Sequence, residues 1–580
     1  MKKKSKKNKN YNVNQKSFYF EDYLETNIKQ KKKGKSLIPE DRIFILFFLF
    51  FSLITIFSIK IMIISIQEPQ FIAANKKILN FYPIRKDITD RNGELISRNI
   101  KAFRAAVKPN LIKNKEKFKI NIKLNFPEIS QIQLEKNILK NKYFYLKKRL
   151  TEKERNILWQ MGEKGLEFES FQTRIYPHGN LYSHILGQIN DENYGISGVE
   201  KYFNNELIDF NKTKESLKLS LDTNIQYLIK KELKLAMEDF KATGAAGLLI
   251  DNKTGEVISL VSLPDYNINI RKNIFDSRYT NKITKGLYEL GSVFKTFTVA
   301  LALEEGLVEP DSNIENISQQ IKCSKYVISD IHKFPRNMSV EDILIQSSNI
   351  GSIKIARSIG EERYKKFLNE LNLLSTPELE LEEVSKPREL KWNKCKLETV
   401  SYGHGIMTTP LQVAAAYATI TNGGYLIKPT LKKNENPINV LLNKQQIISN
   451  ETSKKMIKIL RKVVTDEKGT ASLADVYGYN IGGKTGTAQN YEKKDENINT
   501  FISIFPVQKP KYVMLIMLNN PKPAPHIIYN YRGTSITNIN RNEAGWNSAY
   551  ISGKILRKIG PILAIKNKEV NDSHVAKKLN

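Results

Sequence analysis

Gly291-Ser292-Val293-Phe294-Lys295 is the stretch that decides how the rest of this chain is interpreted, because it contains the only Ser-x-x-Lys tetrad of the 580 residues. Residues 293–305 carry apolar side chains at helical spacing, and Gly306 is a suitable helix stop. We therefore expect Ser292 at a helix N-terminus, with Lys295 one turn further along the same face. A serine nucleophile needs a base for its proton and donors for the oxyanion, and this arrangement offers both. Burial and a second cation would lower the pKa of Lys295 toward the neutral form that a base requires.

Two further motifs follow in an order that suits one site. Ser347-Ser348-Asn349 offers a hydroxyl that can relay a proton and an amide that can hold a substrate carbonyl or orient the lysine. Lys484-Thr485-Gly486-Thr487 offers a cation for a carboxylate, two hydroxyls and a glycine. On an edge strand this glycine would let a substrate backbone lie close as an added strand.

Similar motifs elsewhere in the chain show how specific each of these motifs is. Lys253-Thr254-Gly255 precedes the tetrad and falls in an expected hairpin turn, so we interpret it as structural. Ser97-Arg98-Asn99 lies in a different region. Residues 478–485 fit the phosphate-binding pattern Gly-x4-Gly-Lys-Thr, but neither an apolar strand before them nor a helix after the lysine is expected. We therefore predict no nucleotide-binding loop.

The wider pattern predicts an α+β domain. We expect a helix from residue 223 to about residue 241, then a hairpin of strands 246–251 and 256–263. A second pair of strands is expected at 500–506 and 512–519. Helical stretches fill the sequence between them. Two antiparallel hairpins around a helical block indicate one central antiparallel sheet covered by helices.

The ordered trio of motifs is typical of penicillin-binding proteins and class A β-lactamases. Over about residues 43–565 the chain resembles a class B penicillin-binding protein, a monofunctional peptidoglycan D,D-transpeptidase. The resemblance includes Ser401-Tyr402-Gly403-His404-Gly405-Ile406, Thr409-Pro410-Leu411-Gln412 and Ala544-Gly545-Trp546-Asn547. These details are most similar to the septal, cell-division type, although that type usually has proline where Leu290 stands. The elongation type is the alternative.

The resemblance implies a role for each motif residue. Ser292 would be the nucleophile, Lys295 its base and Ser347 a proton relay, while Asn349 would hold the peptide and the lysine. The backbone N–H groups of Ser292 and Thr487 would form the oxyanion hole. His404 is interpreted as structural. The implied catalytic residues are Ser292, Lys295, Ser347, Asn349 and Lys484, and the implied substrate-binding residues are Thr485, Gly486 and Thr487.

The N-terminus predicts a membrane anchor. Residues 1–42 hold 13 Lys and Arg against 5 Asp and Glu, which is typical of a disordered basic tail. Residues 43–66 are uncharged apart from Lys60, are mainly apolar, and are long enough to cross a hydrocarbon layer of roughly 30 Å. A cleaved signal peptide is the competing interpretation. The basic tail favours a cytoplasmic N-terminus, which places residues 67–580 in the periplasm.

Composition narrows the class of partner. The net charge of +32 favours an anionic surface such as lipid head groups or a cell-wall polymer. No basic array interleaved with aromatics indicates a nucleic-acid groove. We expect no metal and no cofactor, since neither a zinc motif nor a Cys-x-x-Cys occurs. Whether Cys323 and Cys395 pair is left open.

These expectations give one overall prediction. The substrates would be peptidoglycan stem peptides and their lipid-linked precursor, with β-lactams as covalent mimics. The family implies a membrane glycosyltransferase and divisome proteins as partners. A β-lactamase, a β-lactam sensor and a non-enzymatic scaffold are the alternatives. The predicted organisation is a basic tail (1–42), a transmembrane helix (43–66), a non-catalytic pedestal of the dimerisation type (67–215), a transpeptidase domain (216–565) and a polar tail (566–580).

Overall fold

The computed structural model describes residues 40–66, 83–208, 215–270, 276, 279–324, 326–434, 445–489 and 496–579. The chain divides into two compact units, Met1–Phe81 and Tyr82–Asn580. Apart from the first turn of a helix, the predicted basic tail lies outside the described residues.

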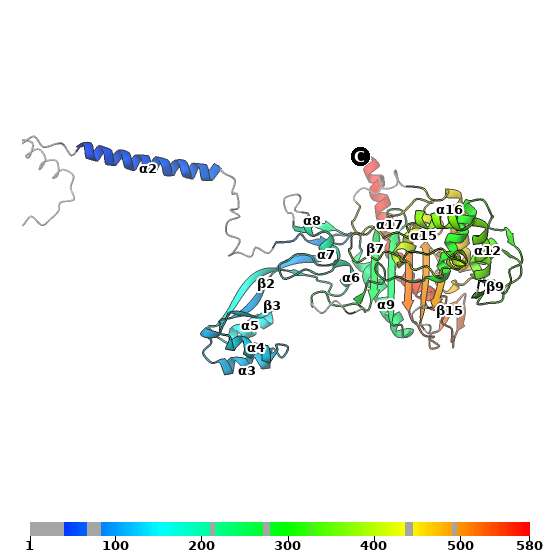
Figure 1. Ribbon diagram of the computed structural model, residues 1–580, viewed down its shortest axis with the longest axis horizontal. Coiled ribbons are helices and arrows are strands. Elements are labelled where there is room, and N and C mark those ends of the chain that lie inside the picture. Colours follow the sequence, from blue (N-terminus) through cyan, green and yellow to red (C-terminus); the bar gives the residue numbers. More distant parts are fainter. Residues whose placement is uncertain are drawn as a thin grey trace, which may run out of the picture. The chain divides into compact units, whose positions relative to one another are not determined.

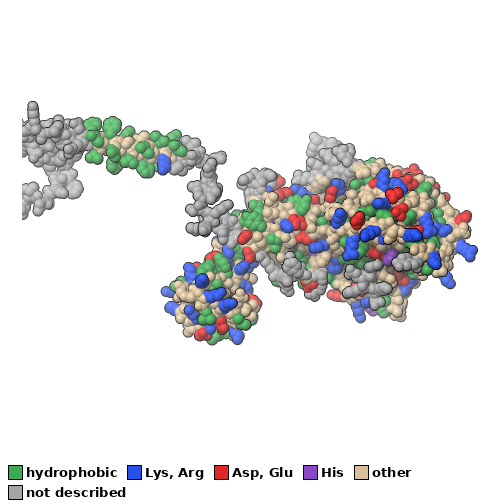
Figure 2. Space-filling model, in the orientation of Figure 1, with side chains coloured by type: hydrophobic (Ala, Val, Ile, Leu, Met, Phe, Trp, Pro, Cys, Tyr) green, Lys and Arg blue, Asp and Glu red, His purple; other side chains and the backbone are tan. Residues whose placement is uncertain are grey.

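In the first unit, helix α2 spans Glu40–Ile66. Its segment Phe44–Ile63 is long and apolar enough to cross a membrane, and none of it is buried within the protein. Figure 2 shows hydrophobic side chains along the visible face of α2. The helix therefore agrees with the span predicted at residues 43–66 and begins three residues earlier.

The centre of the second unit is a five-stranded sheet in the order β12-β13-β14-β6-β7. All its neighbouring strands are antiparallel, as predicted. Strand β14 matches its predicted bounds, whereas β13 begins three residues earlier than expected. The strands are β6 (Gly244–Asp251), β7 (Val257–Leu263), β12 (Gly482–Gln489), β13 (Asn497–Phe505) and β14 (Tyr512–Asn519).

Both faces of this sheet are buried. Alternate residues of a strand point to opposite faces, so each strand contributes side chains to the packing on both. In β14, Val513 and Leu515 join one hydrophobic core, whereas Met514 and Ile516 join the other. The first core includes helices α10 (Lys295–Glu304), α12 (Asn349–Ile359) and α15 (Pro410–Thr421). The second includes α9 (Thr223–Asp239) and α17 (Ser548–Leu579). Figure 1 shows helices on either side of the strands.

Further elements accompany the central sheet. The helices are η3 (Gly291–Phe294), α11 (Val340–Gln346), α13 (Glu361–Glu370), α14 (Lys396–Ser401), α16 (Asn450–Thr465) and η4 (Ser472–Ala474). The short strands are β8 (Asn313–Ile314), β9 (Gln320–Cys323), β10 (Tyr326–Ser329), β11 (Met338–Ser339), β15 (Tyr529–Tyr531) and β16 (Thr534–Ile536). Cys323 and Cys395 form a disulfide, which answers the question that the sequence left open.

A second sheet forms the pedestal, in the order β3-β2-β1-β5, with β4 also paired to β2. It is mixed, because β1 pairs in parallel with β5 while its other pairs are antiparallel. The strands are β1 (Ile88–Thr89), β2 (Leu95–Val107), β3 (Phe144–Leu150), β4 (Leu166–Ile175) and β5 (Leu217–Lys218). The helices are η1 (Pro109–Leu111), α3 (Lys115–Asn125), α4 (Gln131–Leu139), α5 (Glu152–Gln160), α6 (Ser183–Leu186), α7 (Gly198–Tyr202) and α8 (Asn204–Ile208).

Two expected elements differ from the observed ones. The helix predicted after Ser292 is preceded by a 3₁₀ turn, η3, and α10 begins only at Lys295. Such turns are common at helix N-termini. Gly306 has a φ of +65° and ends this helix as predicted. At the C-terminus, α17 continues through residues that were predicted as a polar tail.

Candidate active site

Strand β12 brings the Lys-Thr-Gly motif to the end of the central sheet. Among the residues that the structure describes, its only partner in the strand order is β13, so β12 is an edge strand. A Cβ at Gly486 would lie 2.2 Å from the carbonyl oxygen of Leu290. Glycine is therefore required where β12 passes the turn that carries Ser292. Because residues 484–489 continue the strand without a helix, the phosphate-loop alternative is excluded.

A second close backbone approach packs against the turn that carries Ser292. Gly403 has a φ of +82°, and a Cβ there would lie 2.0 Å from the carbonyl oxygen of Gly291. The neighbouring His404 places Nδ1 2.9 Å from a Glu289 carboxylate oxygen, and hydrogen bonding to Glu289 raises the pKa of His404. Glu289 also accepts a bond from Gly405 N. These contacts fix the loop, in agreement with the structural interpretation of His404.

The Ser-Ser-Asn motif lies between α11 and α12 and carries backbone strain. Ser347 has a φ of +67°, in the left-handed region that non-glycine residues rarely adopt. Such outliers cluster at functional sites. Here the turn points both the hydroxyl and the carbonyl of Ser347 at the amine of Lys295, at 3.1 and 2.5 Å.

The hydroxyl of Ser347 joins the two motif lysines. Lys295 Nζ lies 3.1 Å and Lys484 Nζ 3.0 Å from Ser347 Oγ, and both lysine side chains are fully buried. Within the described residues neither amine has a carboxylate partner at ion-pair distance. Residues that are 189 positions apart in the sequence are thus brought together by a single hydroxyl.

Burial changes the protonation of both lysines. It lowers the pKa of Lys295 to about 7, against a smaller opposing influence of the Asp330 carboxylate. It also lowers the pKa of Lys484 well below its ordinary value, and the positive charge of Lys295 acts in the same direction. A neutral Lys295 is therefore accessible near pH 7, which is the state that a general base needs.

A cavity of about 520 Å³ lies beside the two buried lysines and is lined by Ser347, whose hydroxyl they share. Ser292, Ser347, Thr485 and Thr487 line it, together with residues 331–334, 467–470, 472–473, 541 and 543–546. Thr485 Oγ1 bonds Thr470 Oγ1 at 2.8 Å, and Thr487 Oγ1 accepts a bond from Ala544 N at 3.1 Å. Residues outside β12 thereby orient the hydroxyl groups of Thr485 and Thr487.

Asn349 differs from its predicted contact. Its amide donates to the carbonyl oxygen of Ser329 at 3.1 Å, and no hydrogen bond from it to Lys295 occurs among the described residues. The reason is positional, because Asn349 is the first residue of α12 and lies next to the end of β10.

Two contributors to the site were missed by the sequence analysis. Asp330 bonds Ser348 and the start of α12, and Thr470 bonds Thr485. Both are single polar residues without a motif. The only local signal was the position of Asp330 directly after the short strand-like run Tyr326–Ser329.

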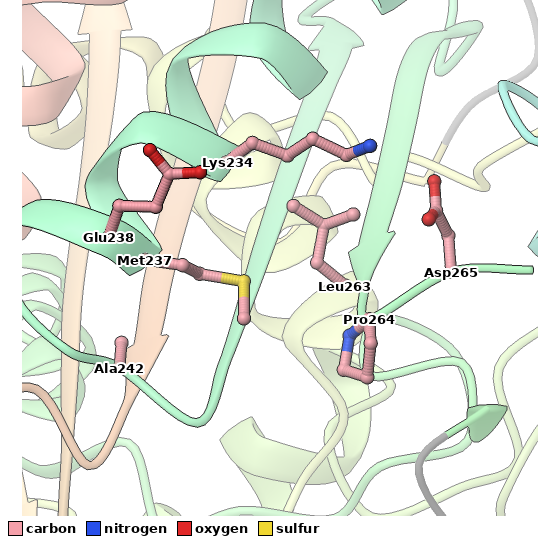
Figure 3. Close-up of a pocket in the computed structure, with 7 residues that line it drawn as sticks. All are labelled: Lys234, Met237, Glu238, Ala242, Leu263, Pro264 and Asp265. Atoms are coloured by element: carbon pink, nitrogen blue, oxygen red, sulfur yellow. The ribbon is translucent and has the colours of Figure 1, made fainter.

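A second hollow, of about 360 Å³, lies between α9 and the end of β7. Figure 3 shows the Met237 side chain reaching in the direction of Leu263 and Pro264, with Lys234 and Asp265 nearby. The carboxylate of Asp265 is already paired with Lys230. No residue of the three motifs lines this hollow.

Comparison with known families agrees with this fold. The family model of the penicillin binding protein transpeptidase domain matches residues 245–542, more than half of the chain. That of the penicillin-binding protein dimerisation domain matches residues 80–220. The chain therefore belongs to the penicillin-binding protein transpeptidases.

Individual relatives narrow this class. The chain is 28% identical over 497 residues to "Probable peptidoglycan D,D-transpeptidase FtsI" of Caulobacter vibrioides, covering 83% of this chain and 82% of the relative. It is 25% identical over 412 residues to peptidoglycan D,D-transpeptidase FtsI of Escherichia coli, covering 66% and 69%. The protein is thus a class B penicillin-binding protein of the septal type, and its enzyme class is peptidoglycan D,D-transpeptidase.

A solved structure shares the fold. Penicillin binding protein 3 of Mycobacterium tuberculosis, in complex with aztreonam, aligns with a TM-score of 0.62 at 22% identity. The alignment covers 84% of this chain and 96% of that one. It supports the predicted fold class, in which a transpeptidase domain is preceded by a mixed pedestal.

Proposed function

We propose that this enzyme is a membrane-anchored serine transpeptidase that cross-links peptidoglycan stem peptides through an acyl-enzyme on Ser292. The observation that carries the proposal is the hydroxyl of Ser347, which bonds two buried lysine amines at 3.1 and 3.0 Å beside the cavity of Ser292. A buried, uncompensated amine is a base in its neutral form, and a shared hydroxyl is a path for its proton.

In the first half-reaction, Ser292 Oγ attacks the carbonyl carbon of the terminal D-Ala-D-Ala bond while Lys295 takes the hydroxyl proton. Backbone N–H groups of Ser292 and Thr487 hold the developing oxyanion, and losing one such donor typically costs on the order of 10²–10³ in rate. The carbon–nitrogen bond then breaks. Ser347 relays the proton from Lys295 to the departing amine of D-Ala, which leaves a serine ester.

In the second half-reaction, the amine of a neighbouring stem peptide attacks this ester. Its proton returns through Lys295 to Ser292 Oγ as the new amide forms. Lys484, Thr485 and Thr487 bind the carboxylate of the donor peptide, which restores the charged form of Lys484. Gly486 lets the donor backbone lie along β12, and the amide of Asn349 contacts the peptide. A β-lactam mimics the dipeptide and acylates Ser292 covalently.

The same proposal includes the topology and organisation of the chain. Helix α2 is the single membrane span, with the N-terminus in the cytoplasm and the catalytic region in the periplasm. The disulfide between Cys323 and Cys395 supports an oxidising compartment. Residues 67–215 serve as the pedestal and 216–565 as the transpeptidase domain. A membrane glycosyltransferase that supplies glycan strands and the divisome proteins are the proposed partners.

The test is covalent labelling of the full-length protein in detergent with benzylpenicillin, followed by intact-protein mass spectrometry. We expect a stable adduct of one drug per chain that maps to Ser292 and is absent in Ser292→Ala. Lys484→Ala should slow labelling strongly, whereas Lys253→Ala, in the similar Lys-Thr-Gly of the β6–β7 turn, should not. Labelling of Ser292→Ala would refute the assignment. An adduct lost within seconds would indicate a β-lactamase instead.

A further inference from the structure

The active site depends on a carboxylate that belongs to none of the three motifs. Strands β9 and β10 form an antiparallel hairpin, and Asp330 follows its last residue. Asp330 Oδ2 accepts a hydrogen bond from Ser348 Oγ at 2.9 Å. Its Oδ1 accepts from the backbone N–H of Asn349 and, at 3.4 Å, from that of Ile350. The carboxylate therefore binds the first two N–H groups of α12, where a helix dipole favours negative charge.

These bonds lie directly after Ser347, the residue of the site with a strained backbone. Ser348 is the N-cap of α12, and its hydroxyl also accepts a bond from Gly351 N at 3.0 Å. Asn349 is bonded a second time, through its amide, to Ser329 at the end of the same hairpin. Ser347 precedes these two residues directly. Its left-handed backbone costs about 1–3 kcal/mol and persists only where surrounding contacts over-determine it.

Ser347 connects the contacts of Asp330 to the lysines of the active site. Its carbonyl and hydroxyl oxygens lie 2.5 and 3.1 Å from Lys295 Nζ, and the same hydroxyl lies 3.0 Å from Lys484 Nζ. If Ser347 relaxed to an ordinary backbone conformation, both contacts would change together. The backbone N–H groups of Ser347 and Ser348 also bond the carbonyl oxygen of Ile343, so the turn is held by α11 on one side and by Asp330 on the other.

We propose that Asp330 is a positioning residue for acyl transfer: by capping α12 from the β9–β10 hairpin, it holds Ser347 in the conformation that connects Lys295 to Lys484. This inference rests on the proposed function of the site and extends it to a residue outside the motifs. Asp330 does not line the cavity. Its effect on the reaction is transmitted by the backbone of residues 347–349 and by its charge.

The charge supplies a readout that a purely structural role would not move. Two ionisable groups face the amine of Lys295 from the elements packed around it. The carboxylate of Asp330, after β10, acts on its pKa, and the amine of Lys484 on β12 bonds the same Ser347 hydroxyl. The turn between α11 and α12 presents only the uncharged Ser347 to this amine. The Asp330 carboxylate raises the pKa of Lys295 against the effect of burial. Removing that negative charge should therefore lower the pKa of Lys295 further.

The experiment measures the second-order rate of acylation of the full-length protein by a fluorescent penicillin from pH 5 to pH 9. Asp330→Asn keeps the shape and removes the charge, while Asp330→Ala removes both. Asp251→Asn is the matched control, because Asp251 also accepts two backbone N–H bonds, at 2.9 Å each, in a turn that does not line the cavity. Melting temperatures are recorded for every variant.

We expect Asp330→Ala to slow acylation at the optimum by on the order of 10²-fold, the typical result of displacing a reacting group by about 1 Å. Asp330→Asn should slow it less, and both variants should shift the acidic limb of the pH–rate profile to lower pH. Asp251→Asn should leave the limb and the rate unchanged.

Two results would overturn the inference. One is acylation within twofold of the wild-type rate in both Asp330 variants across the pH range. The other is a loss of rate that only follows the loss of folded protein, with the acidic limb unmoved. Failure of the proposed function is seen separately, because the wild-type protein would then not be acylated or Ser292→Ala would be.

Discussion

Two clusters of buried charge in this enzyme differ in how the charge is compensated. In the pedestal, Glu200 accepts bonds from Arg85 and Arg174 at 2.8 Å each, and all three side chains are fully buried. In the active site, Lys295 and Lys484 are equally buried but share only a hydroxyl. The first cluster joins distant segments into one structure. The second leaves an amine whose protonation is free to change during a reaction.

The pKa values follow this difference. Burial alone would raise the pKa of Glu200, but Arg174 and Arg85 hold it below its ordinary value, so the carboxylate stays charged. Burial lowers the pKa of Lys295 to about 7, because no carboxylate is close enough to compensate fully. Complete pairing thus gives a permanent charge, whereas incomplete pairing gives a group that can exchange a proton.

Lys295→Met should have the largest effect on catalysis. We expect the rate of acylation by penicillin to fall by about 10²–10⁴-fold, the usual contribution of a general base. The free energy of unfolding should stay the same or rise, because the substitution removes an uncompensated buried amine. Stopped-flow labelling and urea denaturation check the two halves of this prediction. A variant that labels at the wild-type rate would contradict the role of Lys295 as base.

Glu200→Gln should have the opposite result. It leaves Arg85 and Arg174 buried without a counter-charge, which typically costs about 3–5 kcal/mol of stability. Acylation by the folded fraction should be unchanged, since Glu200 does not line the cavity. Urea denaturation followed by circular dichroism measures the loss, and Arg98→Gln, at a half-exposed ion pair with Asp87, is the matched control. Equal losses in the two variants would contradict the comparison.

The sequence could predict the motifs of the site because each is short and ordered along the chain. Strand β14 was predicted with correct bounds, since its apolar run ends at turn residues. The sequence could not predict the contacts that Asp330 and Thr470 make with the motifs. These contacts depend on where the β9–β10 hairpin and the segment after α16 pack, and no periodicity encodes that. For the same reason the pairing of Cys323 with Cys395, 72 positions apart, was left open.

Gly486→Ala tests the backbone of the active site without changing a charge. The added Cβ would lie 2.2 Å from the Leu290 carbonyl oxygen and 3.1 Å from Val293 Cγ1, so β12 must move away from the Ser292 turn. Overpacking of this kind costs about 1–3 kcal/mol. We expect a lower melting temperature and slower acylation together. An unchanged acylation rate would show that the spacing of strand and turn does not limit the reaction.

A change of pH should have the smallest effect on the enzyme, but it should distinguish the two clusters most clearly. The pKa of Lys295 is about 7 in the folded enzyme and about 10.5 when unfolded, so the unfolded chain binds more protons between these values and stability rises with pH across that window. Glu200 has a lowered pKa when folded, so its contribution is present above about pH 4.5 and is lost as the pH falls below that value.

Acylation should therefore fall by roughly tenfold per pH unit below pH 7, as the neutral fraction of the Lys295 base declines. Between pH 7 and pH 5.5 the fold should remain intact, because Glu200 is still charged there. Penicillin labelling and circular dichroism on the same samples separate the two effects. If acylation stayed constant down to pH 5.5, Lys295 would not be the base, and its incomplete pairing would have no catalytic meaning.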